Sequence, residues 1–126
     1  MKLYVASRAS IPERAAMWRK IRDSGVVITS SWIDEDGPGQ TDDYADLWRR
    51  IVHEIAAADR LVLYAESGDF PLKGALVEVG VALGLGKPIT VCLPGVELEP
   101  RSCRPIGSWI CHPLVKRIDD VLEAVR

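Results

Sequence analysis

The chain has 126 residues, enough for one domain with its own hydrophobic core, so residues 1–126 are expected to form a single domain. Its 16 Lys and Arg against 18 Asp and Glu give a formal net charge of -2. This excludes the basic footprint of proteins that bind nucleic-acid polymers or anionic membrane surfaces. A small molecule is the expected partner.

The cysteines and the apolar runs indicate where in the cell the protein is expected. Cys92, Cys103 and Cys111 are an odd number without the spacing of a zinc site, so neither a disulfide framework nor a metal centre is expected. No apolar run approaches the ~20 residues of a membrane span, and the first residues lack the apolar core of an export signal. We therefore expect a cytoplasmic protein that does not enter a membrane.

Short apolar, β-branched runs alternate with longer segments of helical period, a pattern typical of a parallel sheet covered by helices. Residues 2–6 predict the first strand and residues 26–29 the second. Between them a helix is expected to begin with Ser10 as its cap and with Glu13 completing a capping box. Gly25 is expected to end this helix.

A loop rich in acidic residues, glycine and proline, over residues 34–39, separates the second strand from the next helix. Its acids are expected to be solvated rather than to bind a metal. The helix that follows has an apolar stripe at helical spacing, formed by Leu47, Trp48, Ile51, Val52 and Ile55. Residues 61–64 are apolar enough for a central strand buried on both faces.

The C-terminal half continues the alternation. A helix ends before Gly86, residues 89–93 form a fourth strand, and residues 108–111 predict a short fifth one. The last helix is expected to carry the stripe Val115, Ile118, Leu122 and Val125. Five strands with crossovers predict an α/β fold, a flavodoxin-like or Rossmann-like doubly wound parallel sheet of order 2-1-3-4-5 with helices on both faces.

Glu78 is the only ionisable residue between Gly74 and Gly86. A carboxylate in so apolar a segment suggests function, because an unpaired buried charge is costly. In the predicted sheet, ligands bind outside the carboxyl ends of strands one and three, where the loops over residues 6–10 and 66–73 meet. Glu78 lies one turn into the helix after the second loop, so its side chain is expected to point into that crevice.

Three stretches resemble the nucleoside 2-deoxyribosyltransferase family, including its nucleotide-hydrolysing members: residues 2–7, the pair Ala58 and Asp59, and residues 73–89. In that family the matching glutamate attacks the anomeric carbon of a deoxyribose, displaces the base and holds the sugar as an ester. The resemblance implies that Glu78 is this nucleophile, in N-glycosidic cleavage or 2-deoxyribosyl transfer that needs no metal or other cofactor.

The resemblance also implies a role for the end of the first strand. Tyr4 matches a family tyrosine beside the nucleophile, where its phenol would hold the carboxylate by a hydrogen bond. Ser7 and Arg8 precede a helix N-terminus, which offers free N–H groups to an anion such as a 5′-phosphate, and Arg8 would add a bidentate contact. The substrate would then be a nucleoside 5′-monophosphate rather than a nucleoside.

Other substrate contacts are expected from residues around the crevice, namely Ala6, Trp32, Asp69, Gly74 and Ser102. Trp32 follows the second strand and would stack on the base. A neighbouring subunit often completes the site in this family, so a homodimer or higher homo-oligomer is implied, with Ser102 as a residue for that role.

Two departures from the family keep a second hypothesis open. Family members carry an aspartate where this chain has Ile51 and a polar residue where it has Leu72. Asp69 would substitute for the lost acid, or Asp43 and Asp46 would protonate the leaving base. Alternatively, the chain is a non-catalytic protein that binds a nucleotide or a nucleotide-derived signal in the same crevice.

Overall fold

The computed structural model describes residues 1–35 and 42–126, so part of the acidic loop, including Asp36, lies outside the described residues. In the described part, one all-parallel five-stranded sheet has the order β2-β1-β3-β4-β5, which confirms the predicted topology. The strands are β1 (Lys2–Ala6), β2 (Val27–Ile28), β3 (Arg60–Tyr64), β4 (Ile89–Cys92) and β5 (Val115–Arg117). The helices are α1 (Pro12–Asp23), α2 (Tyr44–Ala57), α3 (Gly74–Gly84) and α4 (Val121–Ala124).

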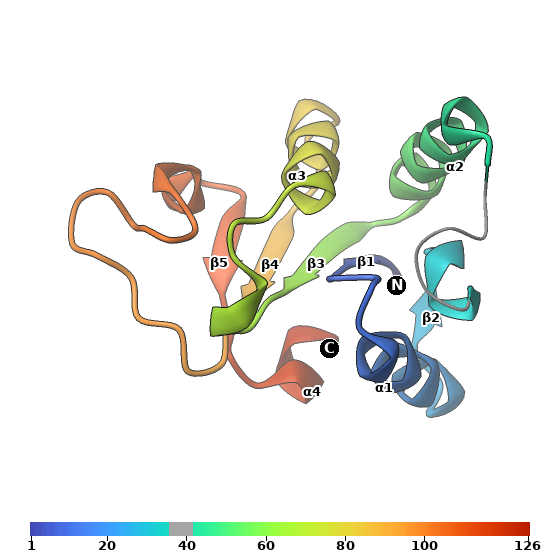
Figure 1. Cartoon of the computed structure of the whole chain (residues 1–126), viewed down its shortest axis with the longest axis horizontal. Helices are drawn as coiled ribbons and strands as arrows, with labels where there is room; N and C mark the ends of the chain where they lie inside the picture. Colours follow the sequence, from blue (N-terminus) through green and yellow to red (C-terminus); the bar gives the residue numbers. More distant parts are fainter. Residues whose placement is uncertain (36–41) are drawn as a thin grey trace.

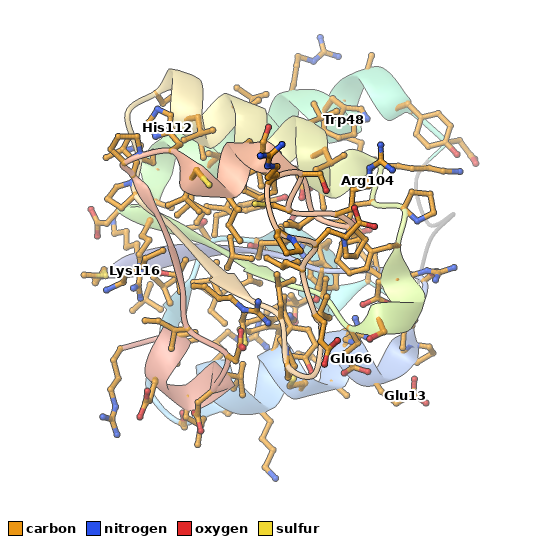
Figure 2. All side chains as sticks on the ribbon, turned by 90° about the vertical axis from the view of Figure 1, so that its left-hand side faces the viewer. Glu13, Trp48, Glu66, Arg104, His112 and Lys116 are labelled. Atoms are coloured by element: carbon orange, nitrogen blue, oxygen red, sulfur yellow. The ribbon has the colours of Figure 1, made fainter. Side chains whose placement is uncertain are left out.

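The helices cover both faces of the sheet. Figure 1 shows α2 and α3 on one face and α1 and α4 on the other, and the view of Figure 2, turned by 90°, shows the same three layers edge-on. Side chains of a strand alternate between the two faces, so β1 contributes to both cores. Tyr4 and Ala6 belong to the core under α2 and α3, whereas Leu3 and Val5 belong to the core under α1 and α4.

The central strand β3 is buried along its whole length, as its composition predicted. It pairs with β1 on one side and with β4 on the other, and Val62 lies opposite both Val5 and Thr90. Burial on both faces explains the continuous apolar run, because neither face of this strand meets water.

The start of α1 differs from the prediction. The N-cap residue is Ile11, it makes no side-chain cap, and Pro12 occupies the first helical turn. The Ser10 hydroxyl instead accepts a hydrogen bond from Nε of Arg8 at 3.2 Å. The capping box of Ser10 and Glu13 was therefore wrong, because the Ser10 side chain is used by the preceding loop. Gly25 does follow the helix end, with a φ of +114°.

Helix α2 begins at a capped residue and packs most of its predicted stripe against the core, with Leu47 and Trp48 half-buried. The Asp43 carboxylate accepts a hydrogen bond from the backbone N–H of Asp46 at 3.0 Å, which satisfies a free donor of the first turn. Ile51 and Ile55 are buried against the sheet. Val52 is 43% exposed, so its place in the stripe was wrong.

The fifth strand and the last helix lie further along the chain than predicted. Residues Ser108–Cys111 form a 3-10 turn, η3, rather than a strand, because Trp109 Nε1 donates to the carbonyl of Ile106 at 2.9 Å and His112 N to that of Trp109 at 3.0 Å. The fifth strand is β5, so Val115 is a strand residue and not part of a helix. The last helix, α4, is a single turn in which Leu122 is 61% exposed.

The sequence predicted that no apolar segment is long enough to span a membrane. Across residues 1–35 and 42–126, no helix has both the length and the apolar character that crossing a bilayer requires.

Candidate active site

A cavity of about 610 Å³ opens at the carboxyl ends of β1 and β3. Its walls come from residues 7–10 after β1, from residues 69–75 after β3, and from Glu78 on α3. Trp48 of α2 and the end of β3 complete the lining. The cavity therefore lies at the point where the connections of the sheet reverse direction, the place where open α/β sheets bind ligands.

Glu78 and Tyr4 meet at this cavity. The Tyr4 hydroxyl donates a hydrogen bond of 2.8 Å to Oε1 of Glu78, joining residues 74 positions apart in the chain. Tyr4 is fully buried on β1, and Glu78 lies one turn into α3, partly exposed to the cavity. Because both elements belong to the rigid core, the carboxylate has a fixed direction, with Oε1 held by the phenol.

The environment alters the protonation of both groups. Burial raises the pKa of Glu78 from 4.5 to about 7; the Tyr4 hydrogen bond lowers it, and the negative charge of Glu54 on α2 raises it further. Burial, together with the neighbouring Glu78, raises the pKa of Tyr4. Near neutral pH, Tyr4 therefore remains a hydrogen-bond donor while Glu78 is close to its titration midpoint.

Two cationic side chains line the cavity. Arg8 is exposed; its Nη1 donates to the carbonyl of Gly68 and its Nε to the Ser10 hydroxyl, each at 3.2 Å. Lys73, the N-cap residue of α3, is also exposed. Among the described residues neither Arg8 nor Lys73 forms an ion pair with a carboxylate, so both charges are free to meet an anionic ligand.

The structure brings five of the sequence-predicted residues to this cavity: Ser7, Arg8, Asp69, Gly74 and Glu78. Tyr4 is hydrogen-bonded to Glu78 but does not itself line the cavity. The Ser7 hydroxyl donates to the carbonyl of Tyr64 at 3.1 Å and so ties the ends of β1 and β3 together.

Three other predicted residues lie away from the cavity lining. Ala6 is fully buried in the core. The Trp32 indole donates to the carbonyl of Val5 at 2.7 Å and packs against the core under α1 and α4, a position that leaves stacking on a base without support. The Ser102 hydroxyl donates to the Glu99 carboxylate at 2.8 Å in the irregular segment after β4, so its expected role in a second subunit stays a prediction.

The acids expected to protonate a leaving base are engaged elsewhere. The buried Asp69 carboxylate forms an ion pair with Arg14. Burial by itself would raise the pKa of Asp69, but hydrogen bonds from Arg14 and from the Glu66 N–H hold it below its ordinary value. Asp43 caps α2, and Asp46 forms an ion pair with Arg50 at 3.2 Å. The lowered pKa of Asp69 disfavours proton donation by this carboxyl near neutral pH.

Several residues of the site were not predicted. Trp48 was assigned to the core, yet its indole lines the cavity and packs against the start of α3, where a Cβ on Gly74 would lie 3.6 Å from Cη2 of the ring. Lys73 and Arg14 were missed as well. Lys73 carried a signal, because it immediately precedes the glycine that opens the Glu78 helix, whereas nothing in the sequence pairs Arg14 with Asp69.

The acidic loop does not supply a metal centre from its described residues. Asp34 forms an ion pair with Arg22 at 2.7 Å and Glu35 with Arg50 at 3.6 Å. Within residues 1–35 and 42–126, no three acidic, histidine or cysteine side chains are grouped closely enough to hold a metal ion.

Comparisons with known proteins give a fold and no family. No protein-family model matches the chain, and a sequence search of curated proteins finds no match. Among solved structures, the chain is similar to a Clostridium botulinum CMP N-glycosidase, BcmB, with a TM-score of 0.58 and 15% sequence identity. The match covers 94% of this chain and 87% of that one. At this identity the likeness shows a shared fold alone.

Proposed function

We propose that this protein cleaves the N-glycosidic bond of a nucleoside 5′-monophosphate, with Glu78 as the nucleophile. The observation that carries the proposal is the 2.8 Å hydrogen bond from the Tyr4 hydroxyl to Glu78 Oε1 at the edge of the cavity. It leaves the second carboxylate oxygen of Glu78 available for attack. The N-glycosidase activity of a protein with the same fold supports the reaction class.

The proposed reaction has two displacements at the anomeric carbon. A Glu78 oxygen bonds to C1′ as the C1′–N bond breaks, and the base leaves with the bonding electrons and gains a proton from water. The oxocarbenium-like transition state is stabilised by the adjacent carboxylate. Water then attacks C1′ and loses its extra proton to the solvent, or another base attacks instead; the ester bond breaks, and Glu78 returns as a carboxylate.

The charge of the cavity supports a phosphorylated substrate. Arg8 and Lys73 line it without carboxylate partners among the described residues, whereas the lining Asp69 is neutralised by Arg14. The guanidinium of Arg8 keeps N–H groups beyond its two internal hydrogen bonds, and such groups suit a phosphate. The volume of about 610 Å³ is in the range of small-molecule sites.

A second function, non-catalytic binding of a nucleotide in the same cavity, is favoured by one observation. Ile51 stands where the resembled family has an acid, and it is buried in the core with 8% of its surface exposed. Glu78 is then the only carboxyl in the cavity lining that lacks a cationic partner among the described residues. A binder needs no group to protonate a leaving base.

One turnover experiment separates the two functions. The protein is incubated with a panel of nucleoside 5′-monophosphates and nucleosides, in ribose and deoxyribose forms, and free base is measured by chromatography. We expect base release from at least one monophosphate, and a loss of about 10³-fold or more in Glu78→Gln, which removes the nucleophile.

The matched control is Glu123→Gln, an exposed glutamate of α4 on the opposite face of the sheet, which should retain full activity. Mass spectrometry of the quenched reaction should detect the sugar phosphate as an adduct on the peptide that contains Glu78. Tight binding of a monophosphate without any base release would reject the catalytic function in favour of the binder.

A further inference from the structure

The turn between β3 and α3 is closed by its own hydrogen bonds. Ser67–Asp69 forms a single 3-10 turn, η2, in which the Glu66 N–H donates to Oδ2 of Asp69 at 2.8 Å and the Asp69 N–H donates to the Glu66 carbonyl at 3.0 Å. The Asp69 side chain, 3% exposed, is therefore the inner anchor of this turn.

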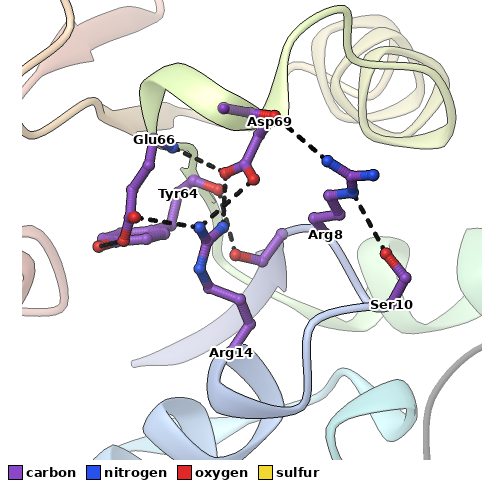
Figure 3. Close-up of polar contacts among 8 residues, drawn as sticks. Arg8, Ser10, Arg14, Tyr64, Glu66 and Asp69 are labelled. Carbon is purple, nitrogen blue, oxygen red and sulfur yellow. Dashed lines mark hydrogen bonds and ion pairs between the residues drawn. The ribbon is translucent and has the colours of Figure 1, made fainter.

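Arg14, in the first half of α1, holds the turn. Its Nη1 and Nη2 atoms donate to Oδ2 and Oδ1 of Asp69, the second at 3.3 Å, and Nη2 lies 3.3 Å from Oε1 of Glu66 (Figure 3). The guanidinium also lies 5.1 Å from the ring centroid of Tyr64, whose hydroxyl donates to Oε2 of Glu66 at 2.6 Å. A bidentate pair of this kind fixes direction as well as distance.

The same turn holds Arg8. The Gly68 carbonyl, in the middle of η2, accepts a hydrogen bond from Nη1 of Arg8 at 3.2 Å. The other end of the guanidinium is held by the Ser10 hydroxyl (Figure 3). Arg8 belongs to the loop after β1, and Gly68 to the loop after β3. The direction of the exposed Arg8 side chain thus depends on the position of the turn that Arg14 and Asp69 fix.

We propose that Arg14 and Asp69 are positioning residues for the substrate phosphate, acting through the Gly68 carbonyl on Arg8. This inference rests on the proposed function, because it assumes that Arg8 binds the phosphate. In this scheme the pair does not bind the sugar or the nucleophile itself, because the Asp69 carboxylate, although it lines the cavity, is held by Arg14 and by the Glu66 N–H. It selects nucleotides over nucleosides by holding the guanidinium of Arg8 where its free N–H groups face the cavity.

An ion pair that only stabilised the fold would have different effects on binding. If the pair only stabilised the fold, its loss would lower the free energy of unfolding and would weaken the binding of nucleoside and nucleotide alike. If it acts through Arg8, its loss weakens nucleotide binding selectively, and the effect vanishes once Arg8 has been removed. A double-mutant cycle tests this dependence directly.

The experiment measures binding by calorimetry in a Glu78→Gln background, so that no substrate is consumed. The probes are the 5′-monophosphate that binds best in the panel above and the corresponding nucleoside. The variants are Arg8→Ala, the pair Arg14→Met/Asp69→Asn, and their combination. Replacing both partners avoids an unpaired buried charge, which would otherwise be strongly destabilising. If the pair variant does not fold, the same measurement is made with Arg14→Lys, which keeps the positive charge but loses the bidentate geometry.

We expect Arg8→Ala and the pair variant each to lower monophosphate affinity about tenfold, the cost of one misplaced charged hydrogen bond, and nucleoside affinity less than about twofold. The pair substitutions should cause no further loss in the Arg8→Ala protein, and Arg14→Lys should cause a smaller loss of the same selectivity. The control Arg22→Met removes an exposed ion pair at the other end of α1 and should change neither affinity.

The outcomes distinguish the positioning role of Arg14 and Asp69 from the proposed function on which it rests. If the starting protein prefers the monophosphate but the pair variant or Arg14→Lys keeps that preference, the positioning role is rejected and the proposed function stands. Additive losses in the combined variant would also reject it. If the starting protein shows no preference for the monophosphate, the phosphate subsite itself is rejected, and the role of Arg14 and Asp69 with it.

Discussion

Glu78 and Tyr4 form a pair in which each residue adjusts the chemistry of the other. Burial destabilises the Glu78 carboxylate and the hydrogen bond from Tyr4 stabilises it. The pKa of Glu78 is therefore raised only to about 7. A nucleophile must be deprotonated to attack. The pKa of Glu78 therefore predicts that kcat/KM increases with pH and levels off above about 7.

Tyr4→Phe tests this pairing. The substitution removes the donor that stabilises the carboxylate, and hydrogen bonds to charged groups contribute about 1.5–3 kcal/mol. The pKa of Glu78 should therefore increase by about one to two units, shifting the rise of the pH–rate profile to higher pH and lowering kcat/KM at pH 7 by about five- to fiftyfold. Steady-state kinetics between pH 5 and 9 measure the shift.

The exposed Tyr44 on α2 provides the control, since Tyr44→Phe should leave the profile unchanged. An unaltered profile in Tyr4→Phe would mean that the phenol does not set the protonation of Glu78 in solution.

At the level of single residues, the sequence predicted the groups whose chemistry is unusual for their surroundings. Glu78 was identified because it is an isolated acid in an apolar helix, and the geometry places it beside Tyr4 as expected. The roles of Asp69 and Trp48 were not predictable in this way. Asp69 is paired with Arg14, 55 positions away, and such pairing is a property of the assembled sheet and not of local spacing.

Helix α2 carries Ile51 at the position where the resembled family has an acid. Its side chain lies in the same core cluster as Tyr4 and Ile55, so this position is a packing site in this chain. We predict that Ile51→Asp does not create a catalytic acid. A buried carboxylate without a partner should instead lower the free energy of unfolding by about 2–5 kcal/mol, measured by urea denaturation.

The neighbouring position supplies the control. Val52→Asp places the same charge on the 43% exposed side of the same helix and should change stability by about 0.5 kcal/mol or less. A faster release of base by Ile51→Asp, without loss of stability, would show that this position can accommodate a catalytic acid.

The elements were predictable wherever one periodicity dominated. The strands β1, β3 and β4 and the helices α1, α2 and α3 lie where the apolar patterns predicted them. Residues 94–107 carry no clear period, and the strand and helix predicted after them were misplaced, because the conformation of this region depends on contacts between distant segments. Arg117, for example, donates through Nη2 to the carbonyls of Leu93 and Val96 at 3.0 and 2.6 Å. This contact ties β5 to the end of β4, which local pattern does not encode.

At the level of the whole molecule, the doubly wound sheet brings two loops together that lie more than fifty residues apart. The order β2-β1-β3-β4-β5 is one of the common orders of doubly wound sheets, and the position of the cavity at its switch point was predicted together with it. The expected homodimer stays a prediction. Leu76, Val77 and Leu85, in and just after α3, are apolar side chains that are each at least 40% exposed.

The site also affects the stability of the molecule as a whole. The folded-state pKa of Glu78 is raised from 4.5 to about 7, so the folded protein holds this proton more tightly than the unfolded chain. The stabilisation linked to that proton is complete below about pH 4.5 and is lost as the pH rises through about 7. A shift of this size corresponds to about 3 kcal/mol.

Glu78→Gln should remove this dependence, because the amide stays neutral at every pH. We therefore expect Glu78→Gln to have a higher free energy of unfolding than the unaltered protein at pH 8, by up to about 3 kcal/mol, and to differ little from it at pH 4.5. Urea denaturation at a series of pH values measures the difference, and Glu123→Gln should show no such pH-dependent gain. A stability difference that does not grow with pH would mean that the Glu78 carboxylate is solvated in the folded protein, and the reduced solvation that gives it its proposed chemistry would then be absent.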